Sequence, residues 1–335
     1  MSDTPRAAGG GFPVVRPRRL RIHPTLRDMA ADTRLRPEDF VQPLFVRPGR
    51  GVRKPVVSMP GVDQLSPDTA VEELRACRDA GVRSYILFGV LEQSAKDPRG
   101  DAAHDPDGPV AETLRRAKDA GIDLLAITDL CYCEYTSHGH CGILAGSAET
   151  VDNDATLPRL GMQAVAHARA GADVIAPSGM MDGAVAAIRS ALDAEGFRNT
   201  AILSYAVKYA SGLYGPFRDA AESPPSFGDR RAYQMDFRDS RTAIREALAD
   251  VQQGADMIMV KPGTLYLDVI RAVRQAVDVP VAAYHVSGEY AMLKAAAAHG
   301  WVDEDRVLLE TMHALKRAGC NFVLTYYARK LAGMV

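Results

Sequence analysis

One phrase recurs along this chain: the end of a helix, then a glycine, then a short apolar run. Copies of it occupy residues 79–88, 119–128, 169–178, 252–261 and 317–326. Glycine at this point suits the left-handed conformation that ends many helices. The run after it does not alternate with polar residues, which is typical of a strand buried on both faces. The repeat therefore predicts a parallel sheet whose strands alternate with helices.

Three more apolar runs fit the same role, at residues 41–46, 201–208 and 281–286, which brings the expected strands to eight. Helical periodicity fills most of the intervals, over 109–120, 156–170, 182–195, 240–253, 265–277 and 302–318. Eight strands alternating with helices over about 300 residues predict an α/β fold, a (β/α)8 or TIM barrel. The main alternative is a doubly wound open sheet. That fold usually has fewer strands and often a glycine-rich dinucleotide turn, and the sequence contains no G-x-G-x-x-G.

Residues 1–40 differ from the rest of the chain. They carry consecutive glycines at 9–11, several prolines and a cluster of arginines at 16–21. This composition predicts an extended N-terminal arm over 1–40, able to contact a neighbouring subunit, ahead of a catalytic barrel over 41–335.

Charge and cysteine content narrow the class of protein. The formal net charge of −2 gives no general attraction for nucleic acid or for a membrane surface, and no apolar run is long enough to span a bilayer. No secretory signal is visible. The chain has five cysteines, and three of them lie between 131 and 141, which indicates a metal site in a reducing compartment and not a disulfide framework. We therefore expect a cytoplasmic protein.

Two lysines close predicted strands. Lys208 ends the run 201–208, and Lys261 ends the run at 257–261. Catalytic groups of such barrels lie at the carboxyl ends of the strands, so both amines are expected in one pocket. Burial and mutual repulsion would lower the pKa of at least one amine and make it a nucleophile toward a ketone. A single lysine in this position would fit a surface residue or a buried ion pair equally well, but two predict an enzyme that binds two carbonyl molecules.

Three cysteines follow another predicted strand. Cys131 and Cys133 are two positions apart, so on an extended backbone they point the same way, and Cys141 follows after a turn-like segment. Three soft ligands with a fourth position open describe a catalytic zinc site. The alternative is that they are inert core thiols. His138 and His140 are lesser candidates, the second as a ligand or as a donor to one.

The loop 209–239 follows a strand end and is rich in Gly, Pro, Ser and Arg, so it is expected at the barrel mouth, where long loops are commonly functional. Arg218, Arg230 and Arg231 in this loop are candidate carboxylate clamps, because arginine binds carboxylates bidentately. Each one alone would also fit a solvated surface. Ser287 and Tyr326, at two other strand ends, offer hydroxyls to a second carboxylate.

From about Arg19 to Leu331 the sequence resembles the porphobilinogen synthase family, also called 5-aminolevulinate dehydratases. The motifs that carry the resemblance are Ser204-Tyr-Ala-Val-Lys208-Tyr-Ala-Ser, Tyr214-Gly-Pro-Phe-Arg-Asp-Ala, Phe227-Gly-Asp-Arg-Arg, Met259-Val-Lys261-Pro-Gly, Tyr284-His-Val-Ser-Gly-Glu-Tyr and Asp129-Leu-Cys-Tyr-Cys-Glu-Tyr-Thr-Ser-His-Gly-His-Cys-Gly. The resemblance implies a lyase of heme biosynthesis that condenses two molecules of 5-aminolevulinate to porphobilinogen with loss of two waters. It implies a Schiff base on Lys261 and another on Lys208, with Asp129 in proton transfer.

The same resemblance implies the substrate-binding residues. Arg218, Arg230 and Gln234 would hold the carboxylate of the substrate on Lys208. Ser287 and Tyr326 would hold that of the substrate on Lys261. Ser178 and Tyr214 complete the implied set.

The metals are also implied by the resemblance. Cys131, Cys133 and Cys141 match the zinc-using branch, whose Zn²⁺ serves the Lys208 side. One residue departs from that branch: Glu134 stands where zinc-using members commonly carry proline, which leaves the metal preference open.

A second metal and the assembly follow from the resemblance as well. Glu246 matches a position that helps to bind an allosteric Mg²⁺ at a subunit boundary in many bacterial members, with Asp173 helping through water. On its own, Glu246 would also fit an ordinary exposed helix glutamate in an i,i+4 pair. The family usually forms homo-octamers from dimers that exchange arms, which agrees with the detached segment 1–40.

Two other functions remain open from the residues alone. A class I Schiff-base aldolase uses the same barrel with one lysine and no metal, and the second lysine and the cysteines argue against it. A non-catalytic metal-binding barrel is the other, and the reactive groups at so many strand ends argue against that.

Overall fold

The computed structural model describes residues 14–146 and 150–335, and the chain divides into two units, Met1–Arg34 and Leu35–Val335. In its described part, the first unit forms the short 3-10 helix η1 (Pro17–Arg21) and helix α1 (Pro24–Ala30), which bury no side chain. Phe40, which the sequence places in the arm, is already the first residue of β1 (Phe40–Val46) and is fully buried.

The second unit is built on a closed ring of parallel strands. Its ten-stranded sheet runs in the order β10-β9-β8-β7-β6-β5-β4-β1-β3-β2, and β10 also pairs with β1. The short β2 (Arg53–Pro55) and β3 (Asp63–Leu65) form an antiparallel pair outside the ring, which leaves eight of the ten strands in it. The others are β4 (Ser84–Gly89), β5 (Leu125–Leu130), β6 (Val174–Pro177), β7 (Ala201–Lys208), β8 (Met257–Lys261), β9 (Val281–His285) and β10 (Phe322–Thr325). The predicted TIM barrel is confirmed.

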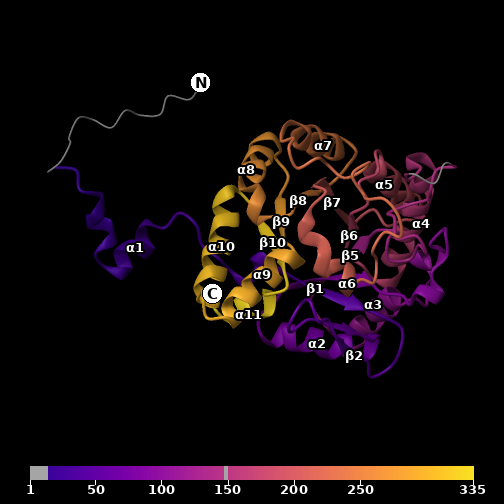
Figure 1. Ribbon diagram of the computed structural model, residues 1–335, viewed down its shortest axis with the longest axis horizontal. Helices are drawn as coiled ribbons and strands as arrows, with labels where there is room; N and C mark the ends of the chain where they lie inside the picture. The colour runs from indigo at the N-terminus through magenta and orange to yellow at the C-terminus, as the bar shows by residue number, and fades with distance from the viewer. Residues whose placement is uncertain (1–13, 147–149) are drawn as a thin grey trace. The chain divides into compact units, whose positions relative to one another are not determined.

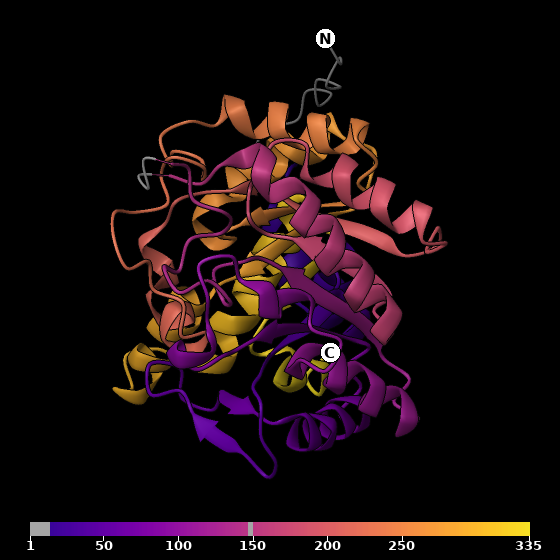
Figure 2. The same ribbon diagram turned by 90° about the vertical axis from the view of Figure 1, so that its right-hand side faces the viewer.

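Helices surround this ring (Figure 1). They are α2 (Pro67–Asp79), α3 (Pro109–Asp119), α4 (Asn153–Ala170), α5 (Ala184–Ala194), α6 (Gly215–Ala220), α7 (Arg241–Gln252), α8 (Leu267–Ala276), α9 (Ser287–Ala298), α10 (Glu304–Ala318) and α11 (Ala328–Ala332). Short 3-10 turns lie between them: η2 (Pro37–Asp39), η3 (Gln93–Ala95), η4 (Asp101–His104), η5 (Gly212–Tyr214) and η6 (Thr264–Tyr266). Figure 2 shows α4 and α5 side by side on the outside of the barrel. None of the helices in the described residues is long and apolar enough to cross a membrane.

The glycine of the repeated phrase has the left-handed conformation that its position predicts. Each of the five copies has a positive φ, for example 112° at Gly171 and 105° at Gly254, where a side chain would strain the backbone. The strand that follows is almost fully buried in each case. Short left-handed turns thus feed apolar strands directly into the ring.

One irregularity in the ring bears on the site. The register between β7 and β8 shifts between Ser204 and Val207, and beyond the shift Lys208 lies directly opposite Lys261. Local disruption of the ladder re-aims side chains at the end of a strand. The predicted pairing of the two lysines at one rim is therefore present in the strand register itself.

Candidate active site

The two lysines are buried side by side at the carboxyl ends of β7 and β8. Lys208 is 5% exposed and Lys261 4% exposed. The Nζ of Lys208 donates a hydrogen bond to the carbonyl of Ser178, at 2.5 Å, just beyond the end of β6. No acidic side chain forms an ion pair with either amine among the described residues, so neither lysine belongs to a buried salt bridge.

Lys261 has an aromatic environment. Its Nζ lies 4.4 to 5.3 Å from the ring centres of Tyr284, Phe217, Tyr205 and Tyr214. Burial, and then the charge of Lys208, lower the pKa of Lys261 to about 7, although Asp129 opposes the change. Close to neutral pH a large fraction of this amine is uncharged and nucleophilic.

Asp129 lies at the end of β5, within the field of both lysines. Burial raises the pKa of Asp129 to about 6, while the charges of Lys208 and Lys261 act against the increase. One carboxylate oxygen accepts a hydrogen bond from the Ser178 hydroxyl at 3.0 Å, and the other has no partner in the described part of the protein. A carboxyl group that titrates near pH 6 with one free oxygen is suited to proton transfer.

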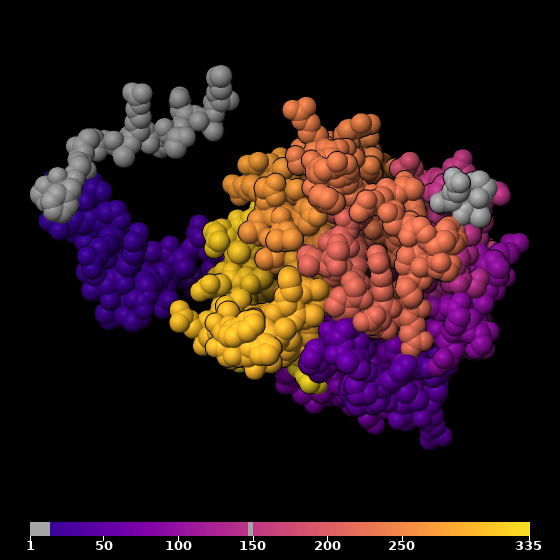
Figure 3. All heavy atoms as spheres, in the orientation of Figure 1, coloured from indigo at the N-terminus to yellow at the C-terminus, as the bar shows by residue number. Residues whose placement is uncertain are grey.

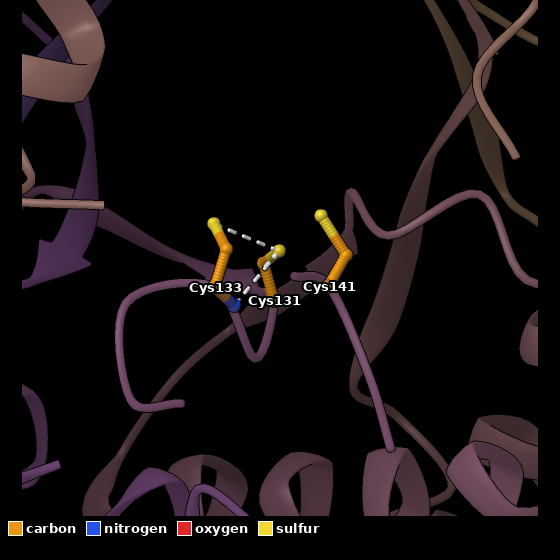
Figure 4. Close-up of side chains that lie close together, drawn as sticks. All are labelled: Cys131, Cys133 and Cys141. Carbon is orange, nitrogen blue, oxygen red and sulfur yellow. Dashed lines mark hydrogen bonds between the residues drawn. The ribbon is translucent and has the colours of Figure 1, made fainter. Parts of the chain in front are cut away.

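The three cysteines form one cluster just beyond β5. Their sulfur atoms all lie within 4.8 Å of one another, and all three side chains are buried. Figure 4 shows the three side chains pointing to the same side, Cys131 and Cys133 from one turn and Cys141 from the adjacent segment. Thiolates around a tetrahedral zinc at about 2.3 Å would be roughly 3.8 Å apart. The donor set and its compactness therefore fit a single zinc ion.

The protonation of the cluster also favours a metal over inert thiols. Hydrogen bonds with Cys131 and Cys133 lower the pKa of Cys141, and the charges of Arg230 and Lys208 act in the same direction, whereas hydrogen bonds with Cys133 and Cys141 raise the pKa of Cys131. Burial in apolar surroundings would by itself raise a thiol pKa, as it does for Cys77 in the core, to about 12. A cluster in which one thiol loses its proton readily is prepared for a cation.

The two histidines of this segment do not face the sulfur atoms directly. His138 uses both ring nitrogens on backbone groups, the carbonyl of Pro98 and the amide of His140. His140 contacts the Tyr233 hydroxyl at 3.0 Å and the Phe227 carbonyl at 3.1 Å. Tyr233 in turn packs against the three cysteines. His140 therefore supports the cluster through Tyr233 and is not placed as a ligand.

The first predicted carboxylate clamp is assembled at the mouth. Arg218, Arg230 and Gln234 line an open hollow of about 590 Å³. Each has a buried side-chain nitrogen without a partner among the described residues. Burial, and then the charge of Arg230, lower the pKa of Arg218. Unpaired buried donors are costly, and two adjacent guanidinium groups repel each other, so this group is suited to an anion.

The second predicted clamp lies on the Lys261 side. The Ser287 hydroxyl, in the first turn of α9, accepts a hydrogen bond from the amide of Phe217 at 2.9 Å. The Tyr326 hydroxyl is 3.0 Å from that of Tyr284, whose ring faces Lys261. The Ser287 hydroxyl also donates to the carbonyl of Leu213 at 3.2 Å, so both hydroxyls contact residues next to Lys261 and do not line its cavity themselves.

Tyr214 has a different contact from the one expected of a substrate ligand. Its hydroxyl donates to the carbonyl of Tyr209 at 2.7 Å and lies 3.3 Å from the carbonyl of Lys261. Tyr214 therefore holds the backbone that carries the lysine.

The space between the reactive groups is almost filled. The cavity between the lysines, Asp129 and two of the cysteines, Cys131 and Cys133, has a volume of only about 10 Å³. That volume holds roughly one water molecule. A substrate can reach the amines only when the side chains and loop segments at the mouth move.

Glu134 is buried beside this cavity but outside the sulfur cluster. One of its oxygens accepts a hydrogen bond from the amide of Gly89 at 3.2 Å, and the other has no partner in residues 14–146 and 150–335. Burial, and then the charge of Asp129, raise the pKa of Glu134. The potential metal-binding group consists of the three cysteines without Glu134.

The predicted magnesium residues are not brought together. Glu246, on α7, lines a hollow of about 270 Å³ with Asp182 and Asp250, and burial, followed by these two charges, raises its pKa. Asp173 lies at the other end of β6, where its carboxylate accepts a hydrogen bond from the amide of Ala126 at 2.8 Å. This arrangement is that of one chain, whereas the expected magnesium lies at a subunit boundary, so the role of Asp173 stays a prediction.

Sequence reasoning missed the residues that shape the pocket without reacting. Tyr205, Phe217 and Tyr284 surround Lys261, and Tyr233 backs the cysteines. Tyr205 stands two residues after Leu203 in an apolar run, so the alternation of side chains along β7 was the pattern that could have indicated which way Tyr205 points. Nothing in the sequence around Tyr233 points to a metal cluster about a hundred residues earlier.

Comparisons with known proteins agree with this geometry. A family model described as delta-aminolevulinic acid dehydratase matches residues 14–334. A protein of that name from Synechococcus elongatus is 54% identical over 323 residues, covering 96% of this chain and 98% of its own. One from Streptomyces coelicolor is 50% identical over 324 residues, with the same two coverages. The crystal structure of the Toxoplasma gondii enzyme with its reaction product porphobilinogen superposes with a TM-score of 0.93 at 42% identity, over 96% of this chain and 91% of that one.

Proposed function

This chain belongs to the delta-aminolevulinic acid dehydratase family and has the porphobilinogen synthase function, and we propose that Lys261 and Lys208 each hold one 5-aminolevulinate as a Schiff base. Membership sets aside the aldolase and the non-catalytic barrel. The observation that carries the proposal is the register of β7 and β8, which places two buried amines opposite each other, one with a pKa of about 7.

The chemistry of each amine follows from its surroundings. The uncharged Nζ of Lys261 attacks a ketone carbon; the C–N bond forms and the carbonyl oxygen leaves as water. The two amine protons leave with this oxygen, and one further proton taken up from solvent gives a protonated imine, which withdraws electrons and acidifies the neighbouring carbon. Asp129 takes and returns protons at that carbon through its free oxygen. Holding both substrates turns a bimolecular condensation into an intramolecular one, an advantage of roughly 7–11 kcal/mol.

The polar groups at the mouth fix the orientation of the two substrates. Arg218, Arg230 and Gln234 bind the carboxylate of the substrate on Lys208, where their unpaired nitrogens find acceptors. Ser287 and Tyr326 bind that of the substrate on Lys261. Exchange of unpaired buried donors for charge-assisted hydrogen bonds is the source of specificity for a carboxylate.

We assign Zn²⁺ to Cys131, Cys133 and Cys141, on the basis of their compact, buried sulfur atoms. When bound, zinc with an open position supplies Lewis-acid chemistry, either polarising a carbonyl or lowering the pKa of a bound water or amine. Tyr233 and Arg230 stabilise the thiolates around it. We assign an allosteric Mg²⁺ to Glu246, supported by the neighbouring Asp182 and Asp250.

The remaining proposals concern assembly and location. We propose a cytoplasmic homo-octamer in which residues 1–40 of each chain contact a neighbouring subunit. The support is that η1 and α1, the two helices in the described part of this segment, bury no side chain. Sedimentation of the full chain and of a chain that begins at residue 35 would test this.

The deciding experiment is incubation of the protein with 5-aminolevulinate, followed by a colour reaction for the pyrrole and by borohydride trapping. We expect product, and mass-spectrometric adducts on Lys208 and Lys261. Lys294, which lies against tyrosine rings outside the pocket, is the internal control and should remain unmodified. Product formation without an adduct on either strand-end lysine would refute the Schiff-base mechanism, and absence of product would refute the function.

A further inference from the structure

A short segment between the two clamp arginines is held in place from several sides. It comprises residues 220–223 and joins α6, which carries Arg218, to the part of the loop that carries Arg230. The carbonyl of Ala220 accepts a hydrogen bond from Gln64 at 2.8 Å, and the carbonyl of Glu222 accepts one from the amine of Lys96. The donors come from β3 and from the turn after β4, so the segment is fixed to elements far away in sequence.

The side chain of Glu222 adds a charged anchor to these backbone contacts. Its carboxylate lies 2.9 Å from the Nζ of Lys54, 3.1 Å from the amide nitrogen of Gln64 and 3.6 Å from Arg47. Arg47 and Gln64 are buried and bonded to each other at 2.6 Å, so two of the three partners are rigid. A network of this kind stabilises more than an isolated surface pair does.

Glu222 also has an unusual backbone. Its φ is +49°, in the left-handed region that residues other than glycine rarely adopt. Such a conformation persists where surrounding contacts hold it. At Glu222 those contacts are the three partners of the carboxylate and the Lys96 amine on the carbonyl.

The anchored segment leads directly to both arginines. The amide of Ser223 donates to the carbonyl of Arg218 at 3.1 Å, and the carbonyl of Ser223 accepts a hydrogen bond from Arg230 at 2.8 Å. In Figure 3 the salmon-coloured residues that follow β7 lie beside the indigo residues of the first barrel segments. Because the cavity must open to admit a substrate, the two arginines need contacts that restore their positions afterwards.

Resting on the function proposed above, we propose that Glu222 is a positioning residue. Its contacts with Lys54, Arg47 and Gln64 hold the clamp segment, residues 220–223, against the β1–β3 side of the mouth. They thereby set the spacing of Arg218 and Arg230 for the substrate carboxylate. Glu222 does not line the cavity around Lys208 and Lys261. It therefore acts on substrate binding and leaves the chemistry of the amines unchanged.

The test compares steady-state kinetics of variants of the full chain with 5-aminolevulinate. Glu222→Ala and Glu222→Gly should each raise KM about fivefold or more and keep kcat within about twofold. Glycine relieves the left-handed φ but removes the carboxylate, so a raised KM in that variant assigns the effect to the side chain. Glu222→Gln keeps an acceptor for Gln64 and should restore part of the affinity. Lys54→Met should raise KM less and add nothing to Glu222→Ala.

Glu92→Gln is the matched control, because Glu92 pairs with the same Arg47 but is exposed and does not contact the clamp segment. It should keep the wild-type KM. An unchanged KM in Glu222→Ala and Glu222→Gly, or a loss of kcat at constant KM, overturns the role of Glu222 while the function stands. If Glu222→Ala fails to fold, Glu222→Gln and Lys54→Met decide the same question. A wild-type protein that makes no porphobilinogen overturns the function and this role together.

Discussion

The lysines and the arginines of this site are held in different ways. Lys208 and Lys261 are fixed by the register of two buried strands, with no loop between them and the ring. Arg218 and Arg230 stand on a short helix and a loop, and their positions depend on backbone carbonyls and on side chains from other parts of the mouth. The difference indicates that the reacting groups are preorganised, while the groups that recognise the substrate can move to admit it.

The largest effect is expected from removal of a reacting amine. Lys261→Met should reduce kcat by about a thousandfold or more, because no other group can form its Schiff base. Product formation measures this loss, and trapping should then find an adduct on Lys208 alone. Lys294→Met is the control and should retain wild-type kcat. Full activity in Lys261→Met would show that the strand-fixed amine of Lys261 is not a reacting group.

Loss of the sulfur cluster comes next. Cys133→Ser should abolish binding of about one equivalent of zinc, which metal analysis of the purified protein measures directly, and should lower the rate of product formation about a hundredfold. Cys77→Ser changes a buried thiol in the core, outside the cluster, and should keep both zinc and activity. Equal zinc content in the two variants would contradict the assignment.

A smaller effect is expected at the clamp. Arg230→Met should raise KM roughly 10- to 100-fold, the loss of one or two charge-assisted hydrogen bonds to a carboxylate. Its neighbour Arg231 is exposed and pairs with Asp229, so Arg231→Met should leave KM near its wild-type value. Similar values for both variants would mean that burial of Arg230 has no bearing on substrate binding.

The smallest effect belongs to α7, outside the barrel ring. Glu246→Gln should remove a magnesium stimulation of about two- to fivefold and leave the magnesium-free rate unchanged. Glu310→Gln, an exposed glutamate on α10, serves as the control. Undiminished stimulation in Glu246→Gln would place the magnesium elsewhere.

The same contrast explains what the sequence could predict. Strand ends and the glycines before them are local patterns, so the barrel, the placement of both lysines at one rim and the proximity of the three cysteines could be predicted. Helix α4 begins at Asn153, ahead of the predicted 156, because Asp152 caps it and Pro158 is tolerated near its start. Because proline usually ends a helix, Pro158 obscured the helical pattern at the start of α4.

Contacts between segments that are far apart in the sequence leave no local pattern from which they could be predicted. Lys54 and Glu222 are 168 positions apart, and only the closed ring brings them together. The hydrogen bond from the amide of Ala126 to the carboxylate of Asp173 is a second example, since it joins residues 47 positions apart. Groups that depend on tertiary contacts for their position were the ones that sequence reasoning missed.

The central claim is that strand register and burial lower the pKa of the Lys261 amine to about 7, so that a large fraction of it is uncharged near neutral pH. The most direct measurement is the initial rate of borohydride trapping at Lys261, followed over roughly pH 5 to 10. Because only the neutral amine attacks, the rate should rise with pH to a plateau, and the midpoint of the rise should lie at about pH 7. Asp129→Asn should move the midpoint to lower pH, since the charge of Asp129 raises the pKa of Lys261. A midpoint near that of an ordinary lysine, about 10.4, would contradict the account.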